Sequence, residues 1–378
     1  MSSFKVVFTL KQHTPIIHFQ SNQSGATLRA TELKPKFDRF LIERNPNIAV
    51  KINANGHKSL DYKVKIEPNI SKREEIPDKS SLFFGNMKPK DMSDIEWQRV
   101  KKRFKTYNRT FKIEFFSFNK DILKAIKNDF EAFLAHTNFG TRGSKGFGSF
   151  YIADRFFDKT LIQHQVYSFS SSNWQKDIGL FYQFLRQGIN FSERTSSPFY
   201  TKPAIFAYAK SKGWQWDKKS IKEFYFSEKL KVQIKKYQSD VVKYTSDEKY
   251  LLRDLFGLSS SQEWKSYSKT IEKEDTKKDK DGKPEIERFK SPITFKVVDG
   301  VVYFWANDTI NDILNQTFEI KIKNRDSLKL STPKEFDFDE FFEFVLKIDL
   351  STHIEEEFHN TNEYKILNRI LNAIKVSR

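Results

Sequence analysis

Four glycines crowd the nine residues from Gly140 to Gly148, between a helix-like and a strand-like segment. Glycine adopts positive φ readily and lets a ligand approach the backbone closely. Successive N–H groups, together with Arg142 and Lys145, suit the oxygens of a phosphate. The spacing matches neither the Walker loop nor the dinucleotide fingerprint. The alternative is a strained turn that only packs the next strand against its sheet, and the loop by itself leaves both interpretations open.

Histidines are the other side chains that could do chemistry. His13 and His18 lie near the first predicted strand and could act as general acid and base, because imidazole titrates near neutrality. The simpler interpretation is that each bonds to backbone at a strand end. His353 and His359 enclose three glutamates, but their spacing places them on different faces of a helix, which favours a solvated charged helix over a metal site. We predict no metal and no cofactor.

Composition limits the class of protein. The 378 residues suit two domains, and the 38% of hydrophobic residues, with 38 Phe, suffice for a core. Lys and Arg number 66 against 49 Asp and Glu, so the net charge of +17 favours nucleic acid, an acidic protein or an anionic surface as partner. The lack of Cys excludes disulfides and thiol nucleophiles. With no signal-peptide pattern and no long apolar run, we expect a cytoplasmic protein without membrane contact.

The first half of the chain alternates strand and helix patterns. Period-two alternation predicts strands over residues 4–10, 60–66, 110–117 and 149–153. Helical periodicity predicts one helix from about Lys34, with Pro35 in its first turn, and a second after an Asn119 cap, ending near His136. The order strand, helix, strand, strand, helix, strand is typical of the ferredoxin-like fold, in which two helices cover one face of an antiparallel sheet.

The second half is less regular. Asp299-Gly300 between two apolar runs predicts a hairpin with a type I′ turn over residues 293–305. The charged tract 272–287, within 265–287, predicts a mobile loop. Further patterns predict strands at 165–169 and 318–323 and helices at 174–186, 201–212, 246–255, 336–346 and 354–374. We therefore expect an α+β fold of two ferredoxin-like (RRM-like, split βαβ) units with helical insertions, over residues 1–158 and 159–378.

Several short motifs carry a resemblance to a known family. The loop TRGSKGFGSF (141–150) resembles the glycine-rich loop of the RAMP superfamily, the CRISPR-associated RNA-binding proteins. FTLKQHTPIIH (8–18) is similar to the first RAMP strand with its Thr-Pro, and LRATELK (28–34) to the element that opens helix one. RDLFG (253–257) and SPI (291–293) resemble two further RAMP motifs. The chain most resembles the Cmr-one family of type III-B effector complexes.

The resemblance implies a non-catalytic RNA-binding subunit of a type III CRISPR effector complex in antiviral defence. It would contact the distal end of the guide RNA and the single-stranded target RNA, with other RAMP and polymerase-like subunits as partners. Phe147 could stack on a base, although burial in the core is the commoner state of Phe. The implied RNA-binding residues are Arg29, Lys34, Arg142, Gly143, Ser144, Lys145, Gly146, Phe147 and Gly148.

Two other clusters are basic, and the second also contains aromatic rings. Within the stretch 88–108, which we interpret as a helical insertion, a basic run could follow RNA or form a solvated helix face. It comprises Arg99, Lys101, Lys102 and Arg103. Trp214, Trp216, Lys218 and Lys219 interleave aromatic and basic side chains. Stacking on bases would be worth roughly 1–3 kcal/mol each, and a packed tryptophan pair is the alternative.

Catalysis is the main point on which the alternatives differ. RAMPs that cleave target RNA carry an Asp in the loop after strand one, and residues 20–26 contain no acid. Processing RAMPs carry the glycine loop near the C-terminus, whereas more than half of this chain follows Gly148. The runner-up is a metal-independent endoribonuclease that processes CRISPR repeat RNA with His13 and His18. A protein–protein scaffold that docks on an acidic neighbour is the third hypothesis.

Overall fold

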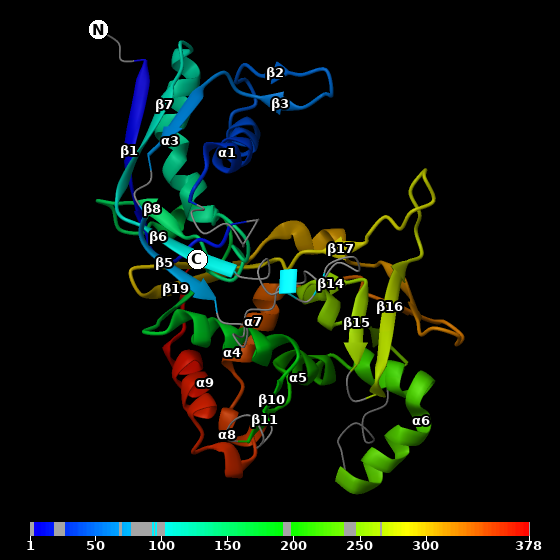
Figure 1. The fold of residues 1–378 in the computed structure, drawn as a ribbon. Helices are drawn as coiled ribbons and strands as arrows, with labels where there is room; N and C mark the ends of the chain where they lie inside the picture. The colour runs from blue at the N-terminus through cyan, green and yellow to red at the C-terminus, as the bar shows by residue number, and fades with distance from the viewer. Residues whose placement is uncertain are drawn as a thin grey trace. The chain divides into compact units, whose positions relative to one another are not determined.

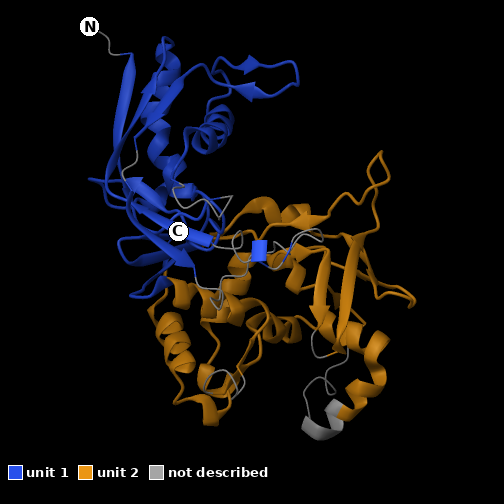
Figure 2. Ribbon diagram, in the orientation of Figure 1, with its two compact units in different colours: residues 1–174, 295–304, 376–378 blue, residues 175–294, 305–375 orange. Residues whose placement is uncertain are grey.

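The chain forms an α+β structure in two compact units. The computed structural model describes residues 4–18, 27–67, 70–76, 93, 95–96, 103–191, 198–237, 247–264 and 267–377. Unit 1 comprises residues 1–174, 295–304 and 376–378, and unit 2 comprises 175–294 and 305–375 (Figure 2). Neither unit is continuous in sequence. No helix in the described ranges is long and apolar enough to cross a bilayer.

Unit 1 begins with a four-stranded sheet in the order β4-β7-β1-β8, with antiparallel neighbours (Figure 1). Helices α1 and α3 pack on each other and on its strands. The bounds are β1 Lys5–Gln12, β4 Lys63–Ile66, β7 Phe111–Phe116, β8 Phe150–Ile152, α1 Ala30–Arg44 and α3 Lys120–His136. The predicted alternation is confirmed, because Phe111, Ile113 and Phe115 are all buried on one face of β7. Asn119 caps α3 as predicted, its side chain accepting from two backbone N–H groups.

Aromatic rings fill the space between the helices and this sheet. Phe37 of α1 lies 4.7 Å from Phe133 and 5.2 Å from Phe130 of α3, measured between ring centroids. Phe130 also contacts Phe8 and Phe115 of the sheet, at 4.7 and 4.9 Å. Edge-to-face and tilted pairs of this kind add to the free energy gained by burying the rings. These Phe residues of unit 1 thus belong to the core, whereas Phe118 and Phe156 are exposed.

The start of α1 differs from the prediction. The helix begins at Ala30, so Pro35 lies inside it rather than in its first turn. Proline there removes one hydrogen bond, to the Thr31 carbonyl, yet burial of Leu33, Phe37 and Leu41 holds the segment helical. The packing of a whole apolar face outweighs one unfavourable residue.

The predicted helical insertion is wrong at its C-terminal end. Residues Arg103–Asn108 form strand β6, which pairs antiparallel with β5, Ile70–Ile76. A short hairpin of β2 (Lys51–Ile52) and β3 (Lys58–Ser59) also precedes β4. The residues of β5 are mostly polar and show no period-two alternation, because most of this strand is exposed to solvent on both faces.

A second four-stranded sheet has the order β18-β19-β9-β22. Its strands are β9 Val166–Ser170, β18 Ile293–Val298, β19 Val301–Ala306 and β22 Lys375–Ser377. The predicted hairpin is confirmed: Asp299 and Gly300 have φ of 47° and 77°, the positive values that a type I′ turn requires. Strand segments from three distant parts of the sequence therefore meet in one sheet.

Unit 2 contains a six-stranded sheet in the order β12-β13-β21-β20-β16-β15, two short strand pairs and most of the remaining helices. The sheet strands are β12 Gln215–Trp216, β13 Lys249–Tyr250, β15 Ser261–Trp264, β16 Lys269–Asp275, β20 Thr317–Lys321 and β21 Leu328–Ser331. The pairs are β10 Ile189–Phe191 with β11 Phe199–Thr201, and β14 Leu258–Ser259 with β17 Arg288–Phe289. The helices are α4 Trp174–Arg186, α5 Ala204–Ser211, α6 Asp217–Tyr237, α7 Phe338–Leu346, α8 Leu350–His353 and α9 Asn362–Ala373.

Three predictions for this region are wrong in part. Residues 246–255 give β13 and a short 3-10 turn, Arg253–Phe256, rather than a helix. The charged tract expected to be a mobile loop supplies strand β16, while residues 276–287 follow in a hydrogen-bonded turn. The helix predicted over 354–374 is divided into a 3-10 turn, Glu356–Phe358, and α9. In β16 the inward positions hold Ile271, Lys273 and Asp275, so charge hides the strand pattern.

Candidate nucleic-acid interface

The glycine loop joins two segments that the sequence analysis singled out separately. The Gly140 amide donates to Glu32 Oε1 of α1 at 2.7 Å, and the Thr141 amide donates to the Ile17 carbonyl at 2.7 Å. The Thr14 hydroxyl donates to the Gly146 carbonyl at 2.6 Å and accepts from the Ser149 amide at 2.9 Å. The loop, the segment after β1 and the first turn of α1 therefore form one surface in unit 1.

Packing explains two of the four glycines. A Cβ on Gly140 would lie 2.3 Å from the Ile17 carbonyl oxygen, and one on Gly148 would lie 1.9 Å from that of Phe139. Both residues also have positive φ, 77° and 64°. The turn-packing interpretation thus holds at both ends of the loop.

Most of the loop amides donate within the protein. The N–H groups of Gly140, Thr141, Lys145, Gly146, Gly148 and Ser149 all have protein acceptors. A phosphate cradle of backbone N–H groups, which the glycine spacing suggests, would have to displace these bonds. Contacts with an anion are better supplied by side chains of this surface.

The candidate side chains differ in how accessible they are. Arg29 precedes the first residue of α1 and is exposed. Arg142 is half-buried with a φ of 59°, and burial lowers the pKa of its guanidinium. Lys145 is half-buried, with its Nζ 5.7 Å from the centre of the Phe295 ring. Gly143 and Ser144 are half-buried and Gly146 is buried. Arg29 and Arg142 are the stronger candidates.

Other predicted residues are engaged inside unit 1. Lys34 donates to Asp38 Oδ2 at 2.7 Å and to the Leu60 carbonyl at 2.9 Å, and it lies over the Tyr62 ring. Phe147 is only 2% exposed and packs edge-on against Trp174, so the expected core position of its ring is confirmed. Arg103 is buried in β6 rather than on a helix. Arg99, Lys101 and Lys102 lie outside the described residues.

Sequence reasoning missed three residues that shape the loop. Lys36 of α1 lies beside the loop, pairing with Glu32 at 2.8 Å and covering the Phe139 ring. The Asn138 amide donates to the carbonyls of Gly143 and Phe295 at 2.7 and 2.8 Å. Lys296, with no exposed surface, donates to Asn138 Oδ1 and to the carbonyls of Thr137 and Phe150. Burial lowers the pKa of Lys296 to about 7. Of these three residues, only Lys36 could have been found from the sequence, because it lies two positions after Lys34.

The two N-terminal histidines are both buried near the loop. His13 donates its backbone N–H to the Ser149 carbonyl, and its Nδ1 accepts from the Asp299 amide at 3.2 Å. Burial lowers the pKa of His13 to about 4, against the partial opposition of the Asp299 carboxylate. His18 is 7% exposed. A neutral His13 at pH 7 is poorly suited to donate a proton, as a general acid must.

This burial makes stability depend on pH. An unfolded histidine takes up a proton near pH 6.5, whereas folded His13 does so only near pH 4, so its contribution is present above pH 6.5 and lost as pH falls to 4. The contribution is at most about 3 to 4 kcal/mol. We expect His13→Gln, which keeps an acceptor for the Asp299 amide, to flatten the decline of the unfolding free energy between pH 7 and 4.5. Denaturant titrations at both pH values measure it, and equal slopes in variant and wild type would contradict the assignment.

The C-terminal histidines have structural partners. His353 is the last residue of α8, and its Nε2 bonds to the Lys202 carbonyl at 2.9 Å. His359 Nε2 bonds to the Ile354 carbonyl at 2.9 Å. The two do not share one helix, so the solvated-helix prediction is wrong. Within the described residues no group of three or more acidic or histidine side chains could hold a metal ion.

Comparison with known proteins supplies two family matches. The model described as the Cmr1 N-terminal domain matches residues 3–189, and the one described as the Cmr1 C-terminal domain matches residues 200–375. A search of curated proteins found no match. The two matches together span both halves of the chain.

Proposed function

The chain belongs to the Cmr1 (Cmr-one) family of type III-B CRISPR RAMP proteins, and from this membership we propose that it binds guide and target RNA in a Cmr complex without cleaving either. The family makes it a Cmr complex subunit in CRISPR defence. The observation that supports RNA binding is the junction of the glycine loop, which carries Arg142, with the first turn of α1, which the exposed Arg29 precedes. The net charge of +17 favours the same class of partner.

Strand order supports a ferredoxin-like origin for both sheets. With the strands of each set counted in chain order, both four-stranded sheets have the order 2-3-1-4, which is the split βαβ arrangement. The first set is β1, β4, β7 and β8, and the second is β9, β18, β19 and β22. In the second set, residues 187–292 and 307–361 are insertions between the helices and strands of the motif. The domain boundary between residues 158 and 159 stays a prediction.

Charge removal at the loop tests RNA binding. We expect Arg29→Gln/Arg142→Gln to weaken single-stranded RNA binding more than tenfold and to flatten the salt dependence by about 1.4 in log–log slope, since each phosphate contact contributes about 0.7. The matched control is Arg39→Gln/Lys127→Gln, which removes the same charge from exposed positions on α1 and α3. Fluorescence anisotropy of labelled RNA over a salt series measures both quantities.

Three outcomes separate the alternative functions. Equal losses of RNA affinity in the two double variants would mean that Arg29 and Arg142 contribute only general charge attraction. Cleavage of repeat RNA in EDTA, abolished by His13→Ala or His18→Ala, would replace the proposal with the endoribonuclease. Absence of RNA binding at low salt would favour the protein scaffold.

A further inference from the structure

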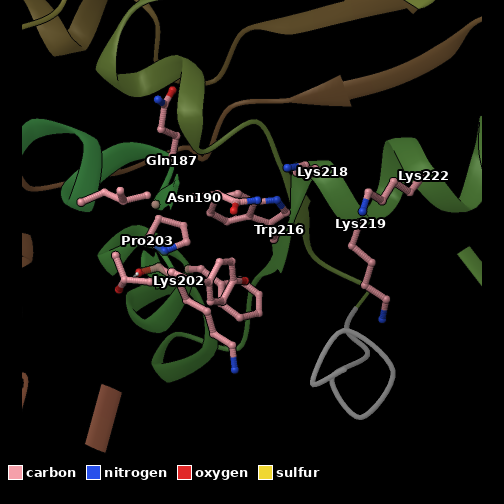
Figure 3. Close-up of a pocket in the computed structure, with 13 residues that line it drawn as sticks. Gln187, Asn190, Lys202, Pro203, Trp216, Lys218, Lys219 and Lys222 are labelled. Atoms are coloured by element: carbon pink, nitrogen blue, oxygen red, sulfur yellow. Dashed lines mark hydrogen bonds between the residues drawn. The ribbon is translucent and has the colours of Figure 1, made fainter. Parts of the chain in front are cut away.

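A pocket of about 240 Å³ opens in unit 2, among the insertions of the second strand set. Its walls come from the β10–β11 pair, the start of α5 and the start of α6 (Figure 3). This volume lies just below the usual range of ligand pockets, roughly 300–1,000 Å³, which suits a ligand of one nucleotide rather than a longer one. None of the predicted glycine-loop residues lines it.

Four lysines surround this pocket: Lys202, Lys218, Lys219 and Lys222. Three of them lie in the first two turns of α6, where the helix dipole favours acidic side chains. Cations at that position weaken the helix start, and a bound anion would offset this effect. Residues that are locally unfavourable, like these lysines at a helix start, are expected at functional sites.

Two of these lysines have lowered pKa values, for which desolvation is the largest cause. Desolvation, with the nearby charges of Arg253 and Lys222, lowers the pKa of Lys218 to about 8, although the side chain reaches solvent. Burial also lowers the pKa of Lys222. The carboxylate of Asp217 opposes the shift at Lys218 but is bound to Arg253, with N···O distances of 2.7 and 2.9 Å. An anion in the pocket would favour the charged lysines.

An aromatic ring and an amide lie side by side at the rim. Tyr200 is 42% exposed and is the direct cross-strand partner of Asn190, which is also exposed. Trp216, 8% exposed, forms an apolar wall and packs edge-on against Phe206. An exposed ring suits stacking on a base, and an amide suits the hydrogen-bonding edge of a base.

The rim is fixed by close backbone packing. Gly188 has a φ of 75°, and a Cβ there would lie 2.4 Å from the Thr201 carbonyl oxygen. The β10–β11 pair can therefore approach only because residue 188 is glycine. The Asp217–Arg253 ion pair likewise fixes the first residue of α6. The pocket is thus preformed, which lowers the entropic cost of binding.

We propose that this pocket binds one nucleotide, with its base stacked on Tyr200 beside the Asn190 amide and its phosphate among the lysines. The nucleotide is either a free mononucleotide or the terminal nucleotide of a single-stranded RNA. The inference does not depend on the loop surface of unit 1. The lysines alone would attract any polyanion, and it is the adjoining ring and amide that specify a nucleotide.

Calorimetric titration with AMP, adenosine and inorganic phosphate tests the chemistry. We expect the wild type to bind AMP more tightly than either fragment. Lys202→Gln/Lys218→Gln should weaken AMP binding at least tenfold and leave adenosine binding unchanged. Tyr200→Ala should weaken AMP and adenosine alike at least fivefold, and Tyr200→Phe should retain both. Lys231→Gln, an exposed lysine farther along α6, is the control. These changes lie at accessible side chains, and thermal melting verifies that each variant folds.

A 12-nucleotide single-stranded RNA separates the two sources. If the ligand is an RNA end, the pocket variants lose RNA affinity and AMP competes with RNA. If it is a free nucleotide, they lose AMP binding alone. The proposal is overturned if AMP does not bind, or if it binds equally to wild type and pocket variants. Either result leaves the Arg29 and Arg142 test intact, so failure here is distinct from failure of the proposed RNA-binding function.

Discussion

Replacing Gly148 with alanine should lower the free energy of unfolding by about 3 kcal/mol or more. Two effects add. A φ of 64° is unfavourable for a residue with a Cβ, and that Cβ would lie 1.9 Å from the Phe139 carbonyl oxygen. The clash is with backbone, which cannot move aside without breaking the hydrogen bond from the Phe139 amide to the Gly148 carbonyl, 2.9 Å long. Urea titration of the full chain measures the loss.

Gly56 provides the matched control for this prediction. Its φ of 77° is equally unfavourable for alanine, but a Cβ at this position would meet nothing within 4 Å. Gly56→Ala should therefore lower the free energy of unfolding by only about 1 kcal/mol, which is the cost of the positive φ alone. If both variants lose the same free energy, the close packing of the loop end against Phe139 is not what demands glycine there.

Removing Asp217 should be comparably severe, at about 3–5 kcal/mol. The carboxylate has no exposed surface and accepts two hydrogen bonds from Arg253, itself 7% exposed. Burial alone would lower the pKa of Arg253, but the carboxylates of Asp217 and Asp254 outweigh it and raise the pKa. Asp217→Ala would leave a buried guanidinium with its main counter-charge gone. Chemical denaturation of the full chain measures the effect.

A double variant that replaces both Asp217 and Arg253 tests whether the unpaired charge causes the loss of stability. Because an apolar replacement of both partners removes the unpaired charge, Asp217→Leu/Arg253→Met should recover most of the loss. Glu228→Ala, which breaks the exposed pair with Lys231, should cost at most about 0.5 kcal/mol. A double variant as unstable as Asp217→Ala would mean that the two side chains stabilise unit 2 through other contacts.

The predictable parts of the fold are those in which local pattern and burial agree. Residues Trp174–Arg186 form the helix that their periodicity indicates, and Asp299-Gly300 forms the expected turn. Where the interior is charged, the pattern fails. Lys273 and Asp254 form a buried ion pair, so β16 shows no apolar alternation, and the pattern over 246–255 predicts a helix where the chain forms β13 and a 3-10 turn. Such pairing depends on residues far apart in sequence, and no local window contains it.

The candidate site divides in the same way. Motif resemblance singled out the loop and the opening of α1 separately, and only the structure joins them. It also could not show that Arg29 is exposed whereas Lys34 is bound to Asp38. The cluster of Trp216 and Lys218 was recognised from the sequence as aromatic and basic, with base stacking and tryptophan packing as the alternatives. Packing describes Trp216 in the structure, although its ring partner is Phe206, and RNA stacking stays a prediction. Trp216 is packed as a structural residue, while Lys218 reaches solvent beside it. Tyr200, paired across strands with Asn190, lines the same pocket as these two residues, which spacing alone does not reveal.

The interleaving of the two units along the chain has a consequence for biosynthesis. Strand β9 leaves the ribosome early, but its neighbour β19 follows more than a hundred residues later. Until then both edges of β9 offer unpaired N–H and C=O groups to any passing strand, because its other neighbour, β22, is synthesised last of all. The nascent chain thus carries an open edge through the synthesis of nearly all the insertions, a period in which chaperones or early assembly with a partner subunit would matter most.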